Sequence, residues 1–481
     1  MSHDWVIRGG TVVTAEKTFR ADVGIRGEKI AEIGPSLSAN KVIDASGKLV
    51  MPGGVDSHCH VEQLSSTGKM CADDFYSATV AAVFGGTTTI VPFAAQHRGN
   101  SIVAVVDDYA KRAAEKAVID YGFHLIIADP SEHALQVELP EMVKRGITSF
   151  KVYMTYELLR LSDEQMLDVL AAAERERALV MVHAENHEMI KWITKRLLER
   201  GHGAPKFHMS AHHPIAEAEA TNRVVALSRL LDVPVLIVHV SGGEAVQTIR
   251  AAQTLGARVL AETCPQYLFL KAGDADKPGM EGAKWCCSPP PRDEASQEAV
   301  WAGLKDGTFA VLSSDHAPYR FDESGKLPKG DKTTFKEMAN GIPGLQVRLP
   351  LLFSEGVGKG RLSVNEFVFL TSTNHARTYG IAEKGRIEAG ADADIAIWEP
   401  EKRVTLTAAM MKDNVGYTPY EGMTVTGWPT TVLSRGRLAV HEGKLLLERG
   451  SGKFIARGVP APVASAKMRE GPAAILRKLI G

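Results

Sequence analysis

The chain has little cysteine, no excess charge and no long apolar run, and each lack excludes a class of protein. Five cysteines among 481 residues are too few, and odd in number, for a disulfide framework, which favours a reducing compartment. The 56 basic and 57 acidic side chains give a net charge of −1, which argues against a nucleic-acid surface or an electrostatic membrane patch. No apolar run approaches the ~20 residues that span a bilayer. The first residues, MSHDWVIRGG, lack the basic head and apolar core of a signal peptide, so we expect a cytoplasmic protein.

What is present is the composition of an ordinary globular protein, with 44% hydrophobic and 23% charged residues. At roughly 150 residues per domain, the length predicts two or three domains. Short strand patterns punctuated by glycine occupy both ends of the chain, for example at 5–13 and 430–435. We therefore predict a small β-sandwich domain formed by residues 1–53 and 383–455. The Ala- and Pro-rich residues 456–481 are predicted to form a C-terminal arm or tail.

The middle of the chain, residues 54–382, alternates continuous apolar runs with amphipathic helix patterns. Strands that are apolar throughout belong to parallel sheets buried on both faces. The candidate strands are 54–58, 87–93, 121–128, 147–153, 179–183, 235–240, 258–263 and 309–314. Strand and helix units repeated in this way predict an α/β fold of the (β/α)8 TIM-barrel type. A doubly wound open sheet is the competing architecture, and periodicity alone does not separate the two.

Residue types that bind metals fall where these strands end. His58 and His60 close the first strand, and because residues i and i+2 of a strand share a face, both can reach one point. The other strand ends carry Lys151, His183, His239 and Asp315. In a barrel all of these ends open on one face, where active sites lie. Histidines and an aspartate that converge there predict a site for a borderline metal such as zinc.

Each of these residues alone has a simpler structural explanation. A histidine at the end of an apolar run is more often hydrogen-bonded in the core than bound to a metal, and Asp315 could cap the turn that follows it. Lys151 could form a salt bridge, which would offset the cost of burying its charge. What favours a functional site is that every member stands at a strand end and none at a strand start.

The order His-x-His, Lys, His, His, Asp on a predicted barrel resembles the binuclear metal-dependent amidohydrolase superfamily. Within it, the sequence is most similar to the dihydropyrimidinase/hydantoinase family, over about residues 4–455. The motifs that carry this resemblance are MPGGVD at 51–56, FKVYMTY at 150–156, HAEN at 183–186, HVS at 239–241, ETCPQYL at 262–268, SPP at 288–290, SSDHAPY at 313–319, NGIPG at 340–344 and GRIEAGADAD at 385–394. The resemblance implies an enzyme that hydrolyses C–N bonds in cyclic amides such as dihydropyrimidines and hydantoins.

The resemblance also implies two divalent metal ions, with Zn²⁺ favoured by the histidine-rich ligands. Lys151 would carry a carbamate formed from CO₂, an anion whose two oxygens can bridge two metals. The ligand set that the resemblance implies is His58, His60, Lys151, His183, His239 and Asp315. A hydroxide between the ions would attack the ring carbonyl, because bound metals lower the pKa of water.

The same resemblance implies roles for further residues in the reaction. Tyr156 would stabilise the oxyanion, with Tyr153 as the rival candidate. Asp315 would pass a proton to the leaving ring nitrogen. Backbone groups of Ser288 and Asn340 would hold the cyclic substrate, and the product would be an N-carbamoyl amino acid. Because the family is usually tetrameric, we expect a homo-oligomer, most simply a tetramer.

The segment after His60 departs from the hydantoinase pattern. It reads VEQLSS at 61–66, where an apolar residue and a proline usually follow the acidic residue, so the preferred ring substituent stays open. Glu62 and Gln63 stand where a dihydroorotase would place an arginine, which argues against that enzyme. The remaining alternatives are a cyclic imide hydrolase, an allantoinase-like enzyme and a non-catalytic scaffold that has lost its metals.

Overall fold

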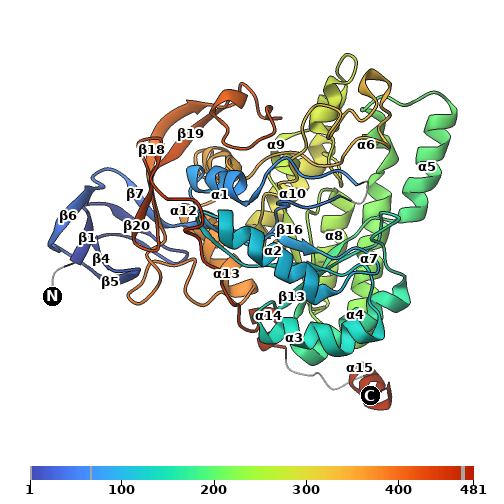
Figure 1. Cartoon of the computed structure of the whole chain (residues 1–481), viewed down its shortest axis with the longest axis horizontal. Helices are drawn as coiled ribbons and strands as arrows, with labels where there is room; N and C mark the ends of the chain where they lie inside the picture. The colour runs from blue at the N-terminus through green and yellow to red at the C-terminus, as the bar shows by residue number, and fades with distance from the viewer. Residues whose placement is uncertain (1–2, 66–67, 467–471, 481) are drawn as a thin grey trace.

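The structure is a computed structural model that describes residues 3–65, 68–466 and 472–480. Figure 1 shows a β-rich part, built from both ends of the chain, beside a larger body in which helices surround strands. Residues 467–471 and 481 of the predicted C-terminal arm lie outside the described residues. Within the described ranges, no helix is long and apolar enough to cross a membrane.

Parallel strands form the barrel in the order that the sequence predicts. One sheet contains β8 (Gly54–Asp56), β9 (Thr87–Ile90) and β11 (Asp120–Tyr121). The other runs in the order β10 (Phe93–Ala95), β12 (His124–Ile126), β13 (Ser149–Tyr153), β14 (Leu179–His183), β15 (Val235–Ile237), β16 (Val259–Thr263) and β17 (Val311–Leu312). A parallel bridge between Cys59 and His316 and a 3.2 Å hydrogen bond from Ser314 N–H to Asp56 Oδ1 join the last strand to the first. The predicted α/β barrel is therefore confirmed, because an open doubly wound sheet has no such closure.

Helices cover the outside of the barrel and bury the outer faces of its strands. The longer helices are α1 (Phe75–Phe84), α2 (Ile102–Lys116), α4 (Asp163–Glu176), α5 (His187–Glu199), α7 (Pro214–Leu231), α8 (Gly243–Thr254) and α10 (Glu294–Asp306). The shorter ones are α3 (Leu139–Lys144), α6 (Phe207–Ala211), α9 (Gln266–Phe269), α11 (Arg348–Leu352), α12 (Val364–Val368), α13 (Asn374–Thr378), α14 (Ala461–Ala464) and α15 (Pro472–Ile480). Asp74 and Ser162 form capping boxes that fix the starts of α1 and α4, and Asn186 caps α5.

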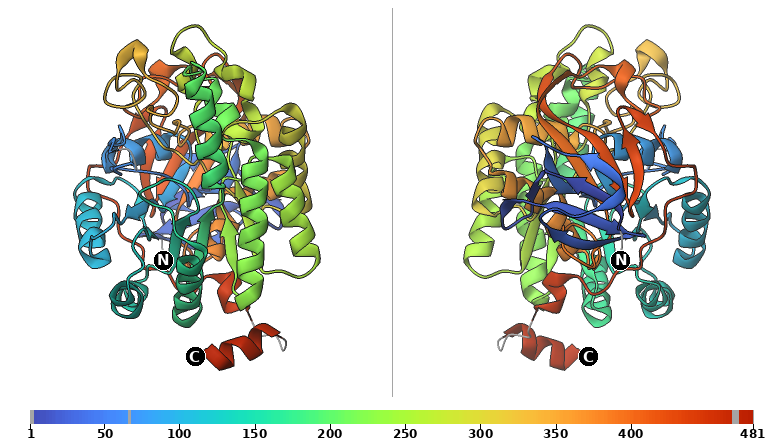
Figure 2. Two further views of the ribbon diagram at one scale, coloured as in Figure 1. Left: turned by 90° about the vertical axis from the view of Figure 1, so that its right-hand side faces the viewer. Right: turned by 90° about the vertical axis from the view of Figure 1, so that its left-hand side faces the viewer.

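Two further sheets contain strands from both ends of the chain. One has the order β5 (Lys29–Gly34), β4 (Asp22–Arg26), β1 (His3–Arg8) and β6 (Ala39–Asp44). The other has the order β21 (Lys444–Leu445), β20 (Arg437–His441), β19 (Thr424–Ser434), β18 (Ile395–Thr405), β7 (Leu49–Pro52), β2 (Thr11–Val13) and β3 (Thr18–Arg20). The right-hand view of Figure 2 faces these strands. The pairing of β7 with β18 brings the two chain ends into one sheet, while the domain boundaries at 53 and 383 stay a prediction.

Residues after Gly452 first run along the barrel. The backbone of Tyr121 on β11 pairs with Lys453 and Ile455. Arg457 is buried, and its guanidinium donates to Ser149 Oγ at 2.8 Å, beneath β13. The start of the predicted arm therefore packs against the barrel wall.

Candidate active site

The residues predicted to bind metals lie together at the carboxyl ends of the barrel strands. His58 and His60 follow β8, Lys151 lies on β13, His183 ends β14, His239 follows β15 and Asp315 follows β17. All of them are buried except His60, which is partly exposed. Side chains far apart in sequence therefore meet at one end of the barrel, where loops leave room for a ligand.

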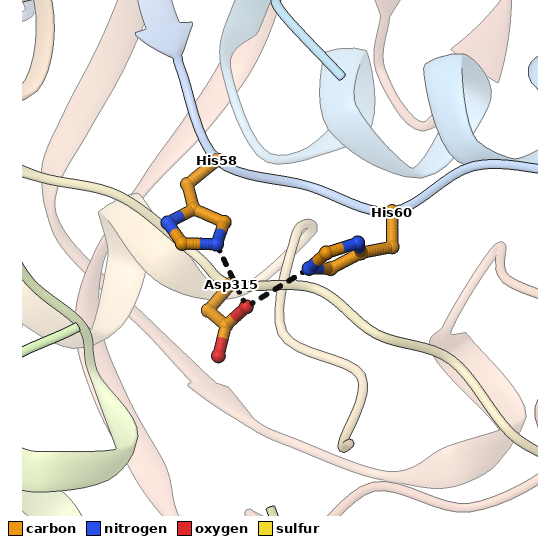
Figure 3. A group of neighbouring side chains, drawn as sticks. All are labelled: His58, His60 and Asp315. Atoms are coloured by element: carbon orange, nitrogen blue, oxygen red, sulfur yellow. Dashed lines mark ion pairs between the residues drawn. The ribbon is translucent and has the colours of Figure 1, made fainter. Parts of the chain in front are cut away.

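Asp315 lies between the two histidines that follow the first strand. Its Oδ1 atom is 3.2 Å from His58 Nε2 and 3.4 Å from His60 Nε2 (Figure 3). Lys151 Nζ lies 3.3 Å from the same nitrogen of His58. The ligand atoms of His58, His60 and Asp315 lie close enough together to share a single ion, which is the arrangement that a metal centre needs.

His183 and His239 extend this cluster on the side of β14 and β15. Their ring centroids are 4.5 Å apart, and the centroid of His239 is 5.3 Å from that of His58. All of the predicted ligands therefore belong to one continuous group.

Hydrogen-bond partners behind the first two histidines determine which ring nitrogen faces the centre. Glu262 Oε1 lies 2.5 Å from His58 Nδ1, and Gln63 Oε1 lies 2.7 Å from His60 Nδ1. Each ring is thereby held with Nδ1 turned outward and Nε2 turned toward Asp315. Such partners are what orients metal-binding histidines in proteins.

The other two histidines are held differently. Glu185 Oε2 lies 2.7 Å from His183 Nε2, which leaves Nδ1 of that ring for the centre, and Glu185 Oε1 accepts from His212 Nδ1 at 2.9 Å. His239 Nδ1 is buried and has no hydrogen-bond partner in the described part of the chain.

The charges of the cluster suit a metal ion. Burial lowers the pKa of both His183 and His239, so their imidazoles stay neutral and keep a lone pair. Burial raises the pKa of Asp315, but the charge of His58 and the hydrogen bonds of His58 and His60 outweigh it and hold that pKa well below the usual range. Neutral imidazole and ionised carboxylate are the forms that zinc binds.

Lys151 is fully buried and has no ion pair with a carboxylate among the described residues. Its Nζ lies 4.9 Å from the ring centroid of Phe93 and 5.2 Å from that of Tyr153. Burial lowers the pKa of Lys151 to about 8. The structure therefore does not support the simpler explanation that Lys151 forms a structural salt bridge.

A cavity of about 760 Å³ opens over the cluster, a size that suits a small-molecule ligand. Its lining includes His60, Lys151, Tyr153, Tyr156, His183, His239, Ser288, Asp315 and Asn340. Within the segment that departs from the family pattern, Gln63 and Ser65 line the cavity. Glu62 instead turns outward to Arg112 and Lys116, and Ser66 lies outside the described residues.

Several residues of this region have a left-handed backbone. The φ angle is 69° at Tyr156, 40° at His239 and 47° at Asp315. Each such conformation costs a non-glycine residue ~1–3 kcal/mol, and it persists only where the surroundings fix it. Strained backbone of this kind gathers at active sites, which agrees with the predicted roles of these residues.

The backbone of Ser288 and Asn340 offers unpaired polar groups to the cavity. The carbonyl oxygen of Cys287 accepts from His208 Nε2 at 2.8 Å, and that of Pro289 accepts from a tyrosine hydroxyl at 2.9 Å. By contrast, no described residue forms a hydrogen bond with the backbone N–H or C=O of Ser288 or Asn340. Both residues line the cavity, so these unpaired groups are available to a ligand.

The sequence analysis missed the residues that hold the histidines in place. Glu262 and Glu185 lie inside the motifs ETCPQYL and HAEN, where a carboxylate in an apolar strand was the available signal. Nothing in the sequence connects Glu262 with His58, because the two are separated by 204 positions.

Comparison with known proteins shows the family of this chain over most of its length. The amidohydrolase family matches residues 49–439. D-hydantoinase from Ralstonia pickettii is 41% identical over 457 residues, which cover 94% of this chain and 99% of the relative. D-hydantoinase from Geobacillus stearothermophilus is 42% identical over 457 residues, with 94% and 96% covered. The solved structure of dihydropyrimidinase from Brevibacillus agri superimposes with a TM-score of 0.92 at 42% identity, covering 95% of this chain and 99% of that one.

Proposed function

Because the chain belongs to the amidohydrolase family and, within it, to the hydantoinases and dihydropyrimidinases, we propose that it opens the rings of hydantoins and dihydropyrimidines to N-carbamoyl amino acids. The chain is a cyclic amide hydrolase, and its family and ligand cluster indicate a binuclear metal site. The observation that carries the proposal is the convergence of histidines, Lys151 and Asp315 beneath a cavity with unpaired backbone groups in its wall.

The proposed metal sites share Lys151. One ion would be held by His58, His60, Lys151 and Asp315, and the other by Lys151, His183 and His239. Zinc is the proposed metal because imidazole nitrogens dominate the ligand set. Divalent ions held there would lower the pKa of water and polarise the ring carbonyl as Lewis acids.

Lys151 takes part as a carbamate. Its neutral amine would add to CO₂, forming an N–C bond and releasing a proton, so that a buried cation becomes an anion with two oxygens. The support is that burial brings the pKa of this amine to about 8 and that no carboxylate among the described residues pairs with the ammonium form. An ammonium ion beside His58 would repel metal ions, whereas a carbamate attracts them.

Tyr156 donates its hydroxyl to the oxygen of the ring carbonyl as negative charge develops there. Burial raises the pKa of Tyr156 well above its usual value, which keeps the proton on the hydroxyl. Tyr153 is the rival candidate, and the two rings lie equally close to His183, with centroids 5.3 Å away for Tyr153 and 5.2 Å away for Tyr156. The strained backbone of Tyr156 favours it as the donor.

Asp315 accepts the proton of the attacking water and returns it to the leaving ring nitrogen. Its carboxylate lies beside His58 and His60 in the cavity lining, where it can reach both the attacking water and the leaving nitrogen. The backbone groups of Ser288 and Asn340 bind the polar edge of the ring. A cyclic ureide carries alternating N–H and C=O groups, which match such donors and acceptors.

The test supplies the enzyme with zinc and bicarbonate and measures its hydrolysis of dihydrouracil, hydantoin, a phenyl-substituted hydantoin, succinimide and allantoin. We expect hydantoin or dihydrouracil to give the N-carbamoyl amino acid, detected by mass. Turnover of succinimide alone would favour the cyclic imide reaction. Turnover of allantoin alone would favour the allantoinase-like one, and both outcomes would contradict the proposal.

We also propose a reducing cytoplasmic setting and a homotetramer. All five cysteines are unpaired and buried, as a reducing compartment permits. Trp192 is 62% exposed and Ile215 43% exposed on the neighbouring helices α5 and α7, which makes this face suitable for contact with another subunit. Light scattering coupled to gel filtration should give four times the mass of one chain, and a monomer would contradict the tetramer.

A further inference from the structure

A buried lysine lies behind the part of the cavity wall that contains Ser288 and Asn340. Lys326 is fully buried, and its Nζ donates to the carbonyl oxygens of Cys286 at 2.7 Å and Ala339 at 2.8 Å. In the described part of the chain, no carboxylate forms an ion pair with it. It does not line the cavity, so it would not touch a bound substrate.

Burying a lysine without a carboxylate partner costs folding free energy, and an apolar side chain of similar length would avoid that cost. Removing a cation from water is unfavourable unless a counter-ion compensates, and replacing buried charges with apolar groups is often neutral or stabilising. Burial lowers the pKa of Lys326 to about 8, with only the thiols of Cys286 and Cys287 opposing the shift. The neutral amine and the ammonium both have N–H donors enough for the two carbonyl groups.

The two carbonyl groups that Lys326 binds stand next to the backbone groups that face the cavity. Cys286 precedes Ser288 by two residues, and Ala339 directly precedes Asn340. The carbonyl of Cys286 also accepts from Gly341 N–H at 3.1 Å, so the two segments contact each other around the lysine. Both segments are loops without a ladder of hydrogen bonds of their own, and Lys326 adds a bond to each of them beside the direct bond between Gly341 and Cys286.

We propose that Lys326 is a positioning residue that holds segments 286–289 and 339–341 at the spacing at which Ser288 and Asn340 bind the two sides of a cyclic ureide. The inference deepens the proposed function and rests on it. Lys326 acts on substrate binding and not on the chemical step, because the groups that it positions contact the ring away from the metals. Its loss should therefore raise KM and leave kcat and metal content close to those of the wild type.

The test compares Lys326→Met with the wild type in kcat, KM for hydantoin and bound metal. We expect KM to rise about tenfold or more while kcat changes less than about threefold and metal content stays constant. Lys326→Gln keeps an amide with two N–H donors and should show a smaller rise in KM. Lys332→Met removes an exposed lysine from the same loop and should behave as the wild type.

The outcomes separate this inference from the proposed function. Hydantoin turnover by the wild type together with an unchanged KM in Lys326→Met would overturn the role of Lys326 alone. Absence of turnover by the metal-loaded wild type would overturn both. If neither the Met nor the Gln variant folds, Lys326 serves the fold and the positioning role is wrong.

Discussion

Two clusters of possible metal ligands lie in different parts of the molecule. One contains His58, His60 and Asp315, and the other contains Asp120, Asp392 and Asp394. The second cluster lies between β11 of the barrel and the start of β18, where the barrel meets the terminal sheets. Both bring charged or polar atoms close together in a buried place, so convergence alone does not distinguish them.

The two clusters differ in whether a lysine neutralises their acidic side chains. Lys384 Nζ lies 2.6 Å from Asp120 Oδ2, 2.9 Å from Asp392 Oδ2 and 2.6 Å from Asp394 Oδ2, so the three acids already have a counter-ion. Burial lowers the pKa of Lys384, but the three carboxylates outweigh it and raise that pKa. Arg435 adds a bond to Asp120 Oδ1 at 3.0 Å.

At the first cluster, no lysine or arginine pairs with Asp315 in the described part of the chain, and its partners are His58 and His60, which give up their protons when a metal binds. Lys151 is near, yet it contacts a histidine nitrogen and no carboxylate pairs with it in the described residues. A cavity lies above this cluster, and its lining includes His60, Lys151 and Asp315. The balance between acidic and basic side chains, more than the number of possible ligands, therefore distinguishes a catalytic site from a structural ion-pair cluster.

The largest expected effect is that of Lys151→Met, which removes the proposed bridge between the two metals. Activity toward hydantoin should fall to background, and bound metal measured by mass spectrometry should be lost with it. Lys144→Met, an exposed lysine of α3, is the control and should retain both. Full metal and activity in Lys151→Met would refute the carbamate.

Lys384→Met should break the second cluster and lower stability without changing the chemistry. Removing the lysine that all three acids share leaves the buried Asp394 without its ion pair, which should reduce the free energy of unfolding by ~3–5 kcal/mol. Lys29 also pairs with Asp392, but its side chain is 44% exposed. Lys29→Met should therefore lower the free energy of unfolding by about 1 kcal/mol or less. Denaturant unfolding measures both variants. An equal loss of unfolding free energy in Lys384→Met and Lys29→Met would contradict the special role of Lys384.

The pH dependence of this stability follows from the direction of the shift. A lysine whose folded pKa is raised contributes fully below its unfolded pKa of ~10.4, and the contribution is lost only as pH rises through the folded value. The difference in unfolding free energy between the wild type and Lys384→Met should therefore be the same at pH 7 and pH 9. A marked narrowing over that range would show that Lys384 is not charged in the folded protein.

Tyr156→Phe tests the oxyanion donor at the first cluster. Loss of one such donor should lower kcat by ~10²–10³-fold, with metal content unchanged. Tyr153→Phe, measured alongside, should lower kcat far less. The reverse order would assign the role to Tyr153.

Glu262→Gln should have the smallest effect of these, because it acts through His58. Loss of a partner that orients a metal-binding histidine costs ~10–100-fold in metal affinity. Ser313→Ala, which removes the 2.7 Å bond from Ser313 Oγ to Glu262 Oε2, should weaken metal binding by less. Competition with a chelator measures the metal affinity of both variants. An unchanged affinity in Glu262→Gln would show that Glu262 does not support metal binding.

The site residues that could be predicted from the sequence are those that lie at the ends of their own strands. His58, Lys151 and Asp315 could be placed because an apolar run that ends in a polar residue is visible locally, and a parallel barrel brings all such ends together. Glu262 and Lys326 could not be placed, because their roles depend on partners that only the folded chain supplies.

The same limit applies to the fold. The barrel strands follow from continuous apolar runs, whereas the packing of residues after Gly452 does not. Arg457 reads as a surface residue in an Ala- and Pro-rich segment, yet it is buried against β13. Its burial depends on acceptors such as Ser149 Oγ that lie far away in the sequence.

The most direct test of the central claim is the metal content of the purified chain measured together with its turnover of hydantoin, before and after chelation. A binuclear metal hydrolase should contain about two divalent ions per chain, lose turnover when they are removed, and regain both when zinc and bicarbonate are returned. Undiminished turnover by metal-free protein would contradict it.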